Sequence, residues 1–205
     1  MSATRRDLIR SALAGGAAAG LGLAIGDGTA LAGPIAPLQG ANTDGQVLLR
    51  LMEFEQLEIF AYEHVERTAV LSGEARATVS HFLAQEHTHA AVLSALLTKR
   101  GVAVPPPPST VSEADAKLAA LLVARRLDEA HHELTAMHLL IGIETVAETI
   151  YHLAIEKLTG PLPELAARIL GCEAQHWTGL SSVLHDGNPV LAVPSEFAPF
   201  ATNPS

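Results

Sequence analysis

Apolar residues recur along this chain at helical spacing, and polar residues interrupt the pattern at a few regular places. From Val79 to Leu97 they follow the i, i+3, i+4, i+7 order that places them on one face of a helix. Glu86 occupies a position in this stripe, between Leu83 and Ala90, and His89 lies one turn further along. Burying a charged carboxylate costs several kcal/mol unless another group compensates it. Glu86 and His89 are therefore candidates for sharing a metal ion.

The same polar pattern occurs a second time. Glu173 and His176 repeat the E-x-x-H spacing inside another apolar stripe. Upstream of each E-x-x-H, a further predicted helix has one Glu among its apolar positions and a Tyr almost two turns later. These pairs are Glu55 with Tyr62 and Glu144 with Tyr151. Two helix pairs with one polar pattern indicate an internal duplication of a helical hairpin.

Glycine and proline positions divide the chain into elements. Long helices are predicted over residues 45–71, 73–100, 128–158 and 163–185, and a short one over 112–126. Whether the short helix joins the following long one directly is left open. The first and second long helices are joined by a tight turn, as are the third and fourth, so each pair is antiparallel. Between the second and third helices lies a long connector that contains four successive prolines, Pro105 to Pro108. The fold predicted is an all-α four-helix bundle with one long crossover between the second and third helices.

The N-terminal 32 residues are predicted to be a signal peptide and not part of the fold. Arg5 and Arg6 precede a weakly hydrophobic segment over 11–25, and small residues at 30–32 suit cleavage after Ala32. This pattern resembles a twin-arginine signal, which predicts export to the periplasm, cell envelope or exterior. The alternatives are an ordinary secretory signal with an accidental Arg pair, or an uncleaved anchor. The apolar segment is too short and too rich in Gly to span a bilayer comfortably. The mature chain is predicted to have no transmembrane helix.

The remaining domain boundaries follow from composition. Residues 33–44 are predicted to be a flexible spacer, 45–186 the bundle, and 187–205 a Pro-rich extended tail. The formal net charge is −9 and no basic cluster is present, so nucleic acid is not an expected partner. Cys172 is the single cysteine, which excludes an intramolecular disulfide and a thiolate metal cluster. Beside Glu173, it is expected to be a small packing residue.

On these residues the chain resembles the ferritin-like superfamily of di-iron carboxylate proteins, of the rubrerythrin and bacterioferritin kind. The resemblance rests on residues 54–62, on 143–146 with Tyr151, and on the two E-x-x-H pairs, and it extends over about 46–184. It implies that two iron or two manganese ions are held by six side chains of the bundle core. The implied ligands are Glu55, Glu86, His89, Glu144, Glu173 and His176.

Several other residues compete for roles at this site. In the family, a Tyr at the offset of Tyr62 and Tyr151 lies near the metals, which implies a catalytic role; the alternative is an ordinary core tyrosine. Glu58 and Glu148, one turn from the lone Glu residues, are either additional ligands or carboxylates at the rim of the site. Five histidines are predicted to lie on the surface, and the placement of His152 is left open. These five are His81, His87, His131, His132 and His138.

Carboxylate and imidazole donors without thiolates suit iron or manganese. Without metal, the four buried carboxylates are expected to raise one another's pKa values. The function predicted is an exported di-metal oxidoreductase that oxidises Fe(II) or reduces dioxygen or peroxide, as a ferroxidase, peroxidase or catalase-like enzyme, in oxidative stress or iron handling. The alternatives are a non-catalytic iron-binding protein and a metal-free envelope or stress interaction bundle. Its expected partners are small oxidants or Fe(II), and whether it forms a homodimer is left open.

Overall fold

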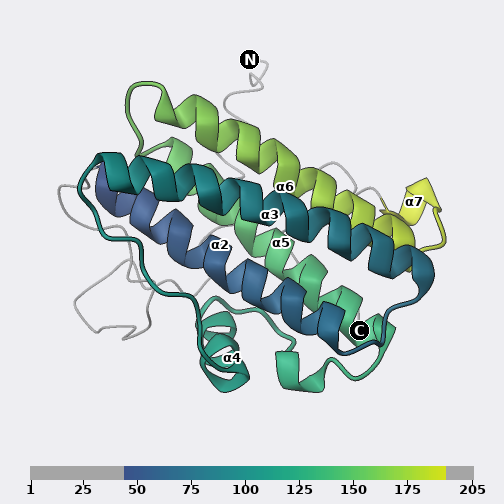
Figure 1. The fold of residues 1–205 in the computed structure, drawn as a ribbon. Helices are drawn as coiled ribbons and strands as arrows, with labels where there is room; N and C mark the ends of the chain where they lie inside the picture. Colours follow the sequence, from purple (N-terminus) through teal and green to yellow (C-terminus); the bar gives the residue numbers. More distant parts are fainter. Residues whose placement is uncertain (1–43, 193–205) are drawn as a thin grey trace, which may run out of the picture. The chain divides into compact units, whose positions relative to one another are not determined.

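The computed structural model describes residues 44–192, and within that range all regular structure is helical. Four long helices lie side by side, which confirms the predicted all-α four-helix bundle (Figure 1). They are α2 (Asp44–Arg67), α3 (Gly73–Lys99), α5 (Glu133–Ile155) and α6 (Leu162–Leu184). The predicted signal peptide, most of the spacer and the end of the Pro-rich tail lie outside the described residues.

Two antiparallel helix pairs make up the bundle. Helix α2 packs along α3, and α5 packs along α6, with a short connection inside each pair. Between the pairs, the chain passes through α4 (Val111–Ala120) and the 3-10 turn η1 (Leu127–Glu129), and α4 packs against α2 (Figure 1). The predicted long crossover is therefore present.

The end of α3 follows from a glycine. Gly101 has a φ of 69°, and its N–H donates to the carbonyl of Thr98, while the N–H of Val102 donates to the carbonyl of Leu97. This is the Schellman arrangement, which glycine favours because a Cβ strains the left-handed conformation. The helix ends at Lys99, close to the predicted position.

Other helix ends differ from the sequence-based expectation. Helix α2 ends at Arg67 and not at 71, and α5 begins at Glu133 and not at 128. Ahead of α5, the buried carboxylate of Asp115 accepts the backbone N–H of Leu127 at 2.6 Å and that of Asp128 at 3.4 Å. These bonds tie η1 to α4, so the chain cannot continue there into the long helix.

The start of the predicted tail is also different. Regular structure was expected to stop at 186, but residues Pro189–Ala192 form the short helix α7. The carbonyl of Asn188 accepts the N–H groups of Leu191 and Ala192, at 3.1 and 2.9 Å. Proline is well suited to the first position of a helix, because a backbone N–H there would make no hydrogen bond within the helix.

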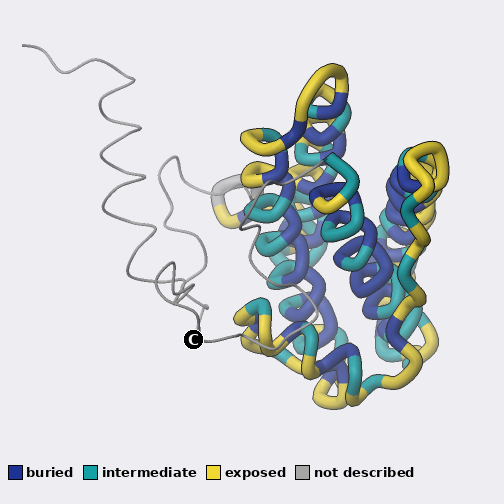
Figure 2. Tube along the Cα trace, turned by 90° about the vertical axis from the view of Figure 1, so that its left-hand side faces the viewer, coloured by how far each residue is buried: buried dark blue, intermediate teal, exposed yellow. Residues whose placement is uncertain are grey.

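The core consists of two apolar clusters, one toward each end of the bundle. One contains Phe54, Tyr62 and Val79, and the other contains Leu93 and Tyr151. The inward faces of all four long helices are buried along their length (Figure 2). On α3 and α6 the E-x-x-H residues lie between the segments that build the two clusters. On α2 and α5, Glu55 and Glu144 lie in the first cluster's segment, near its border with the second, so the candidate site is close to mid-height in the bundle.

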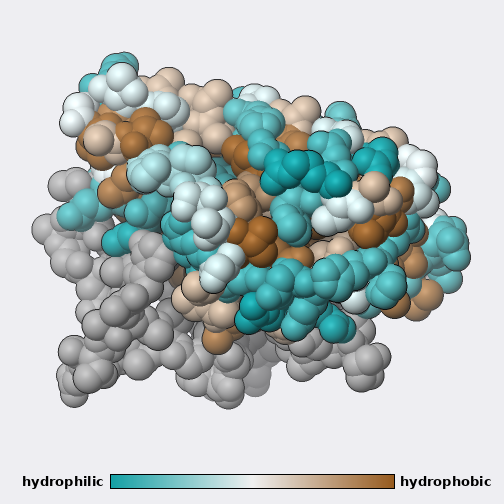
Figure 3. Space-filling view, turned by 60° about the horizontal axis from the view of Figure 1, so that its bottom comes forward, coloured by the Kyte–Doolittle hydropathy of each residue, from teal (hydrophilic) through white to brown (hydrophobic). Residues whose placement is uncertain are grey.

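On the face shown in Figure 3, hydrophobic side chains are scattered among hydrophilic ones. Large hydrophobic residues with substantial exposure include Leu122, Leu134 and Leu191. Within residues 44–192, no helix combines the length and the apolar character that a membrane span requires.

Candidate metal centre

Each of the four long helices brings a predicted glutamate ligand into the middle of the core. These residues are Glu55 on α2, Glu86 on α3, Glu144 on α5 and Glu173 on α6, and all four are fully buried. His89 and His176 accompany them from α3 and α6. The helical periodicity forces this placement, because each glutamate occupies a position of its helix's apolar stripe. All six predicted ligand residues therefore lie together in the structure.

His89 contacts carboxylates from three helices through one ring nitrogen. Its Nδ1 lies 3.0 Å from Glu173 Oε1, 3.1 Å from Glu86 Oε2 and 3.7 Å from Glu55 Oε2. The side chain retains 11% of its exposure. Helix α3 thus places His89 across the bundle from α6, within reach of both E-x-x-H glutamates.

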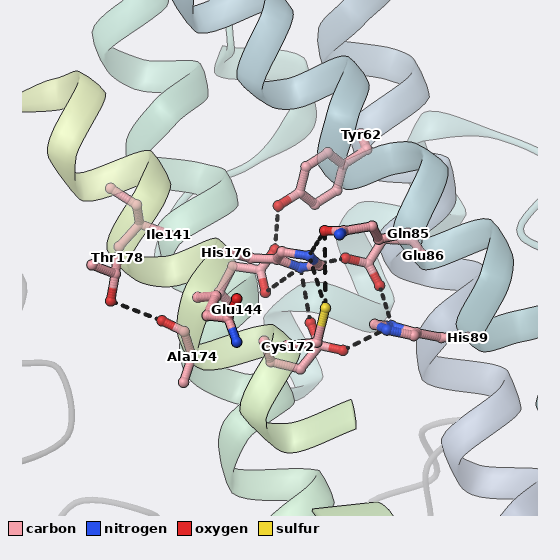
Figure 4. A network of polar contacts seen from close by, with 12 residues as sticks. Tyr62, Gln85, Glu86, His89, Ile141, Glu144, Cys172, Ala174, His176 and Thr178 are labelled. Carbon is pink, nitrogen blue, oxygen red and sulfur yellow. Dashed lines mark hydrogen bonds and ion pairs between the residues drawn. The ribbon is translucent and has the colours of Figure 1, made fainter. Parts of the chain in front are cut away.

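His176 repeats this arrangement from the other half of the chain. Its Nδ1 lies 2.7 Å from Glu86 Oε1, 3.2 Å from Glu173 Oε2 and 3.7 Å from Glu144 Oε2 (Figure 4). This side chain is fully buried. The two histidine rings lie 6.1 Å apart with an interplanar angle of 24°. The internal duplication predicted from the sequence is thus visible as two equivalent sets of contacts.

The six residues form two overlapping groups that can each hold a metal ion. In each group, one ligand atom per residue lies within 4.8 Å of the others. Glu86 and Glu173 belong to both groups. The first group adds Glu55 and His89, and the second adds Glu144 and His176.

The hydrogen-bonding state of the site fits a cation. Eight buried polar atoms of the cluster have no hydrogen-bond partner among the described residues, although several lie close to one another. Native proteins leave few buried polar atoms unpaired, and unpaired carboxylate oxygens are the costliest of these. A cation at this place compensates them, so the residues present fit a metal. The atoms are Glu55 Oε2, both carboxylate oxygens of Glu58, Glu86 Oε1, Glu144 Oε2, both carboxylate oxygens of Glu173, and His176 Nδ1.

Both tyrosines touch the site. The hydroxyl of Tyr62 donates a hydrogen bond to Glu144, and the hydroxyl of Tyr151 donates one to Glu55. Both rings are fully buried, and burial first, then the neighbouring carboxylates, raises the pKa of each hydroxyl. Both hydroxyls therefore stay protonated and donate to the glutamate of the other half. Their predicted catalytic role stays a prediction.

Electrostatics divides the carboxylates into two kinds. Burial, followed by the charges of Glu86 and Glu173, raises the pKa of Glu55, and burial likewise raises that of Glu144. Burial alone would also raise the pKa of Glu173, but its contacts with His176 and His89 hold it at about 2. The expectation that all four carboxylates would have raised pKa values is therefore wrong for Glu173.

The histidines show the complementary shift. Burial alone would lower the pKa of His89, but short contacts with Glu173 and Glu86 raise it to about 11. Similar contacts with Glu144 and Glu173 raise the pKa of His176 far above its usual value, also against the effect of burial. Without metal, two imidazolium ions thus supply part of the positive charge that the carboxylates require.

Glu58 lies deeper than a rim carboxylate. It is fully buried, and burial and then the charge of Glu86 raise its pKa. It belongs to neither group of potential ligands. Glu148 is half-buried, and burial and the charge of Glu173 raise its pKa. The duplication explains the difference, because Glu58 follows Glu55 by three residues whereas Ala147 has that place after Glu144.

The other histidines lie away from the centre. Four of the five predicted surface histidines are exposed, and His138 is half-buried. His152 is also exposed, which answers the question that the sequence left open. The exposed four are His81, His87, His131 and His132.

Sequence reasoning missed two residues that contact His176. Gln85 Oε1 lies 2.7 Å from His176 Nε2, and Phe82 stacks on the imidazole with ring centres 4.3 Å apart. Cys172, expected to be a packing residue, is partly exposed, and its Sγ lies 3.4 Å from the same nitrogen (Figure 4). The sequence held one signal for Gln85 and Cys172: each directly precedes the glutamate of an E-x-x-H pair.

Comparison with known proteins agrees with this architecture. The family model described as the ferritin-like domain matches residues 43–186, which is most of the chain. No curated protein and no solved structure matches the chain. The family match confirms the resemblance drawn from the two E-x-x-H pairs, and the chain belongs to the ferritin-like domain family.

Proposed function

We propose that this protein binds two iron or two manganese ions in the middle of its bundle and uses them to oxidise Fe(II) or to reduce dioxygen or peroxide. One observation carries the proposal: two groups of four buried ligand residues share Glu86 and Glu173, and eight polar atoms of the cluster have no hydrogen-bond partner among residues 44–192. Shared carboxylates are the ligands that hold two metal ions close together in such sites.

The residues divide into matching sets. Glu55 and His89 would complete the first metal position, and Glu144 and His176 the second, with Glu86 and Glu173 common to both. Oxygen and imidazole donors without thiolate favour iron or manganese over softer metals. When bound, such a pair supplies or accepts electrons in reactions with small oxidants.

The chain's own groups would prepare this chemistry. Tyr62 and Tyr151 hold the carboxylates of Glu144 and Glu55 in place from the opposite helix. The apolar clusters on either side exclude water from the carboxylates. His89 is buried but its side chain keeps 11% of its exposure, so a small reactant would approach from its side.

The activity is tested by purifying the protein from its own host's envelope, measuring its metal content and following oxidation of added Fe(II) by dioxygen and by peroxide. We expect about two iron or manganese ions per chain and repeated turnover above the uncatalysed rate. Binding of two ions without turnover would indicate a non-catalytic iron-binding protein. A folded, metal-free protein would contradict the proposal and favour an interaction bundle.

We further propose export by the twin-arginine route, which accepts folded proteins and so allows metal to be loaded before export. The proposal rests on Arg5 and Arg6 ahead of the apolar segment. Replacing both with Lys should retain the precursor, with its metal, inside the cell, as fractionation and immunoblotting would show. Unchanged export of this variant would contradict the route.

A further inference from the structure

We infer that the two metal positions are unequal, because Gln85 and Phe82 hold His176 in a fixed orientation, whereas no equivalent pair among the described residues holds His89. The inference rests on the proposed metal centre and names Gln85 as a positioning residue for one of its two halves. The duplication of the chain makes the comparison direct, since each half carries the same ligand set.

The contact between Gln85 and His176 determines which ring nitrogen of the histidine faces the carboxylates. The amide oxygen of Gln85 accepts a hydrogen bond and lies 2.7 Å from His176 Nε2 (Figure 4). Nε2 must then carry the proton, so in the neutral imidazole the free electron pair is on Nδ1, which points at Glu86 and Glu173. Hydrogen bonds of this kind orient a histidine ligand and raise its basicity. Gln85 adds no charge in doing so.

The face of the same imidazole is also held. Phe82 stacks on His176 at 4.3 Å between ring centres, with an angle of 29°. The phenyl ring fits there because residue 179 is glycine: a Cβ at Gly179 would lie 2.5 Å from Phe82 Cζ. His176 is thus fixed at its edge by Gln85 and at its face by Phe82, and it is fully buried.

His89 has a different environment. Within residues 44–192, no hydrogen-bond partner is present at its Nε2, and its side chain keeps 11% exposure. By the duplication, Cys172 holds the position equivalent to Gln85, directly before the E-x-x-H glutamate. Its thiol, however, lies 3.4 Å from His176 Nε2 and 3.9 Å from Gln85 Oε1. Gln85 and Cys172, the residues directly before the two E-x-x-H glutamates, therefore both contact His176.

A preorganised ligand loses less conformational freedom when a metal binds. The position completed by His176 and Glu144 therefore binds its metal ion more tightly than the position completed by His89 and Glu55. The position of His89 and Glu55 binds the more weakly and exchanges its ion more readily. The side chain of His89 keeps 11% of its exposure whereas that of His176 keeps none, so the weaker position is the nearer to solvent.

The test is a titration of the purified metal-free full chain with Co(II), followed by visible absorption and by competition with a chelator. We expect two binding steps with dissociation constants at least about tenfold apart. Gln85→Leu should weaken the tighter step by about 10–100-fold and leave the weaker one unchanged. His176→Ala should abolish the tighter step, and His89→Ala the weaker, which assigns each step to its half.

Matched variants separate positioning from general effects. Gln85→Glu, unlike Gln85→Leu, has a hydrogen-bond acceptor in a side chain of the same shape, so it should bind the first ion as tightly as the wild type does. A merely structural role for Gln85 would not predict this difference between the two variants. Gln175→Leu and Gln175→Glu make the same changes at an exposed residue of α6 beside His176 and should leave both steps unaltered. Circular dichroism would verify that every variant is folded.

The outcomes are distinct. Two equal steps in the wild-type protein, or a Gln85→Leu variant that keeps the tight step, would overturn this inference and leave the metal centre standing. A folded wild-type protein that binds no Co(II) would overturn the metal centre itself, and this inference with it.

Discussion

The hydroxyl of Tyr62 on α2 donates its hydrogen bond to Glu144 on α5, and not to Glu55 on its own helix. Tyr151 on α5 makes the reciprocal bond to Glu55 on α2. The two hairpins are thus cross-connected at their candidate metal ligands, and each half orients a carboxylate of the other.

Removing either hydroxyl should destabilise the bundle. Tyr62→Phe keeps the buried ring but leaves a carboxylate oxygen of Glu144 without its donor. An unsatisfied buried acceptor costs about 1–3 kcal/mol. Urea unfolding of the metal-free protein measures the change, and Tyr151→Phe should give a similar value through Glu55. A loss below about 0.5 kcal/mol for both variants would show that the hydroxyls do not support the carboxylates.

The metal-free protein should be more stable near pH 5.5 than near pH 8. Glu55 and Glu144 have folded-state pKa values above their unfolded values, so their contribution is lost as pH rises through the folded values. His89, with a pKa of about 11, also loses its contribution as pH rises above its unfolded value of 6.5. The pKa of Glu173 is lowered to about 2, so its contribution to stability changes with pH only below about pH 4.5, outside the interval from pH 5.5 to 8.

Thermal melts at the two pH values, with and without Mn(II), measure this dependence. Bound metal supplies the positive charge directly, so it should raise the melting temperature and reduce the pH dependence. A metal-free protein that is equally stable at both pH values would contradict the arrangement of charges described above.

A Cβ at residue 179 should disturb the contact between Phe82 and His176. In Gly179→Ala the added carbon lies 2.5 Å from Phe82 Cζ, and overpacking of this kind costs about 1–3 kcal/mol. Gly171→Ala is the matched control on the same helix, because among the described residues no atom outside its own stretch of helix lies within 4 Å of its Cβ. That control should gain up to about 1 kcal/mol from helix propensity. Chemical denaturation compares the two, and equal effects would show that Phe82 moves aside freely.

Helical periodicity was sufficient to predict which glutamates meet in the core. It put Glu55, Glu86, Glu144 and Glu173 on apolar stripes, and residues that share buried faces of four packed helices must meet. The connections between them predicted the antiparallel pairs and the crossover. Helix ends were less accurate, because the start of α5 depends on the contact of Asp115 with η1, which no local pattern encodes.

Other features required the three-dimensional structure. Gln85 is one residue from Glu86, yet it contacts a histidine on another helix, so only the packing of α3 against α6 reveals it. The low pKa of Glu173 likewise depends on two histidines that approach it at the same time, one from its own helix and one across the bundle. Sequence spacing showed that a second carboxylate follows Glu55, but not that Glu58 is fully buried.

The central claim is that Glu86 and Glu173 hold two metal ions in common. Its most direct test is the metal content of the wild-type protein and of Glu86→Ala, Glu173→Ala and Glu53→Ala, each loaded with Mn(II) or Fe(II), desalted and analysed by plasma mass spectrometry. Glu53 is the matched control, because it lies on α2 away from the site and pairs with Arg50 at 2.7 Å. We expect about two ions per chain in the wild type and the control, and no stoichiometric metal in the other two variants. Equal metal content in all four proteins would contradict the claim.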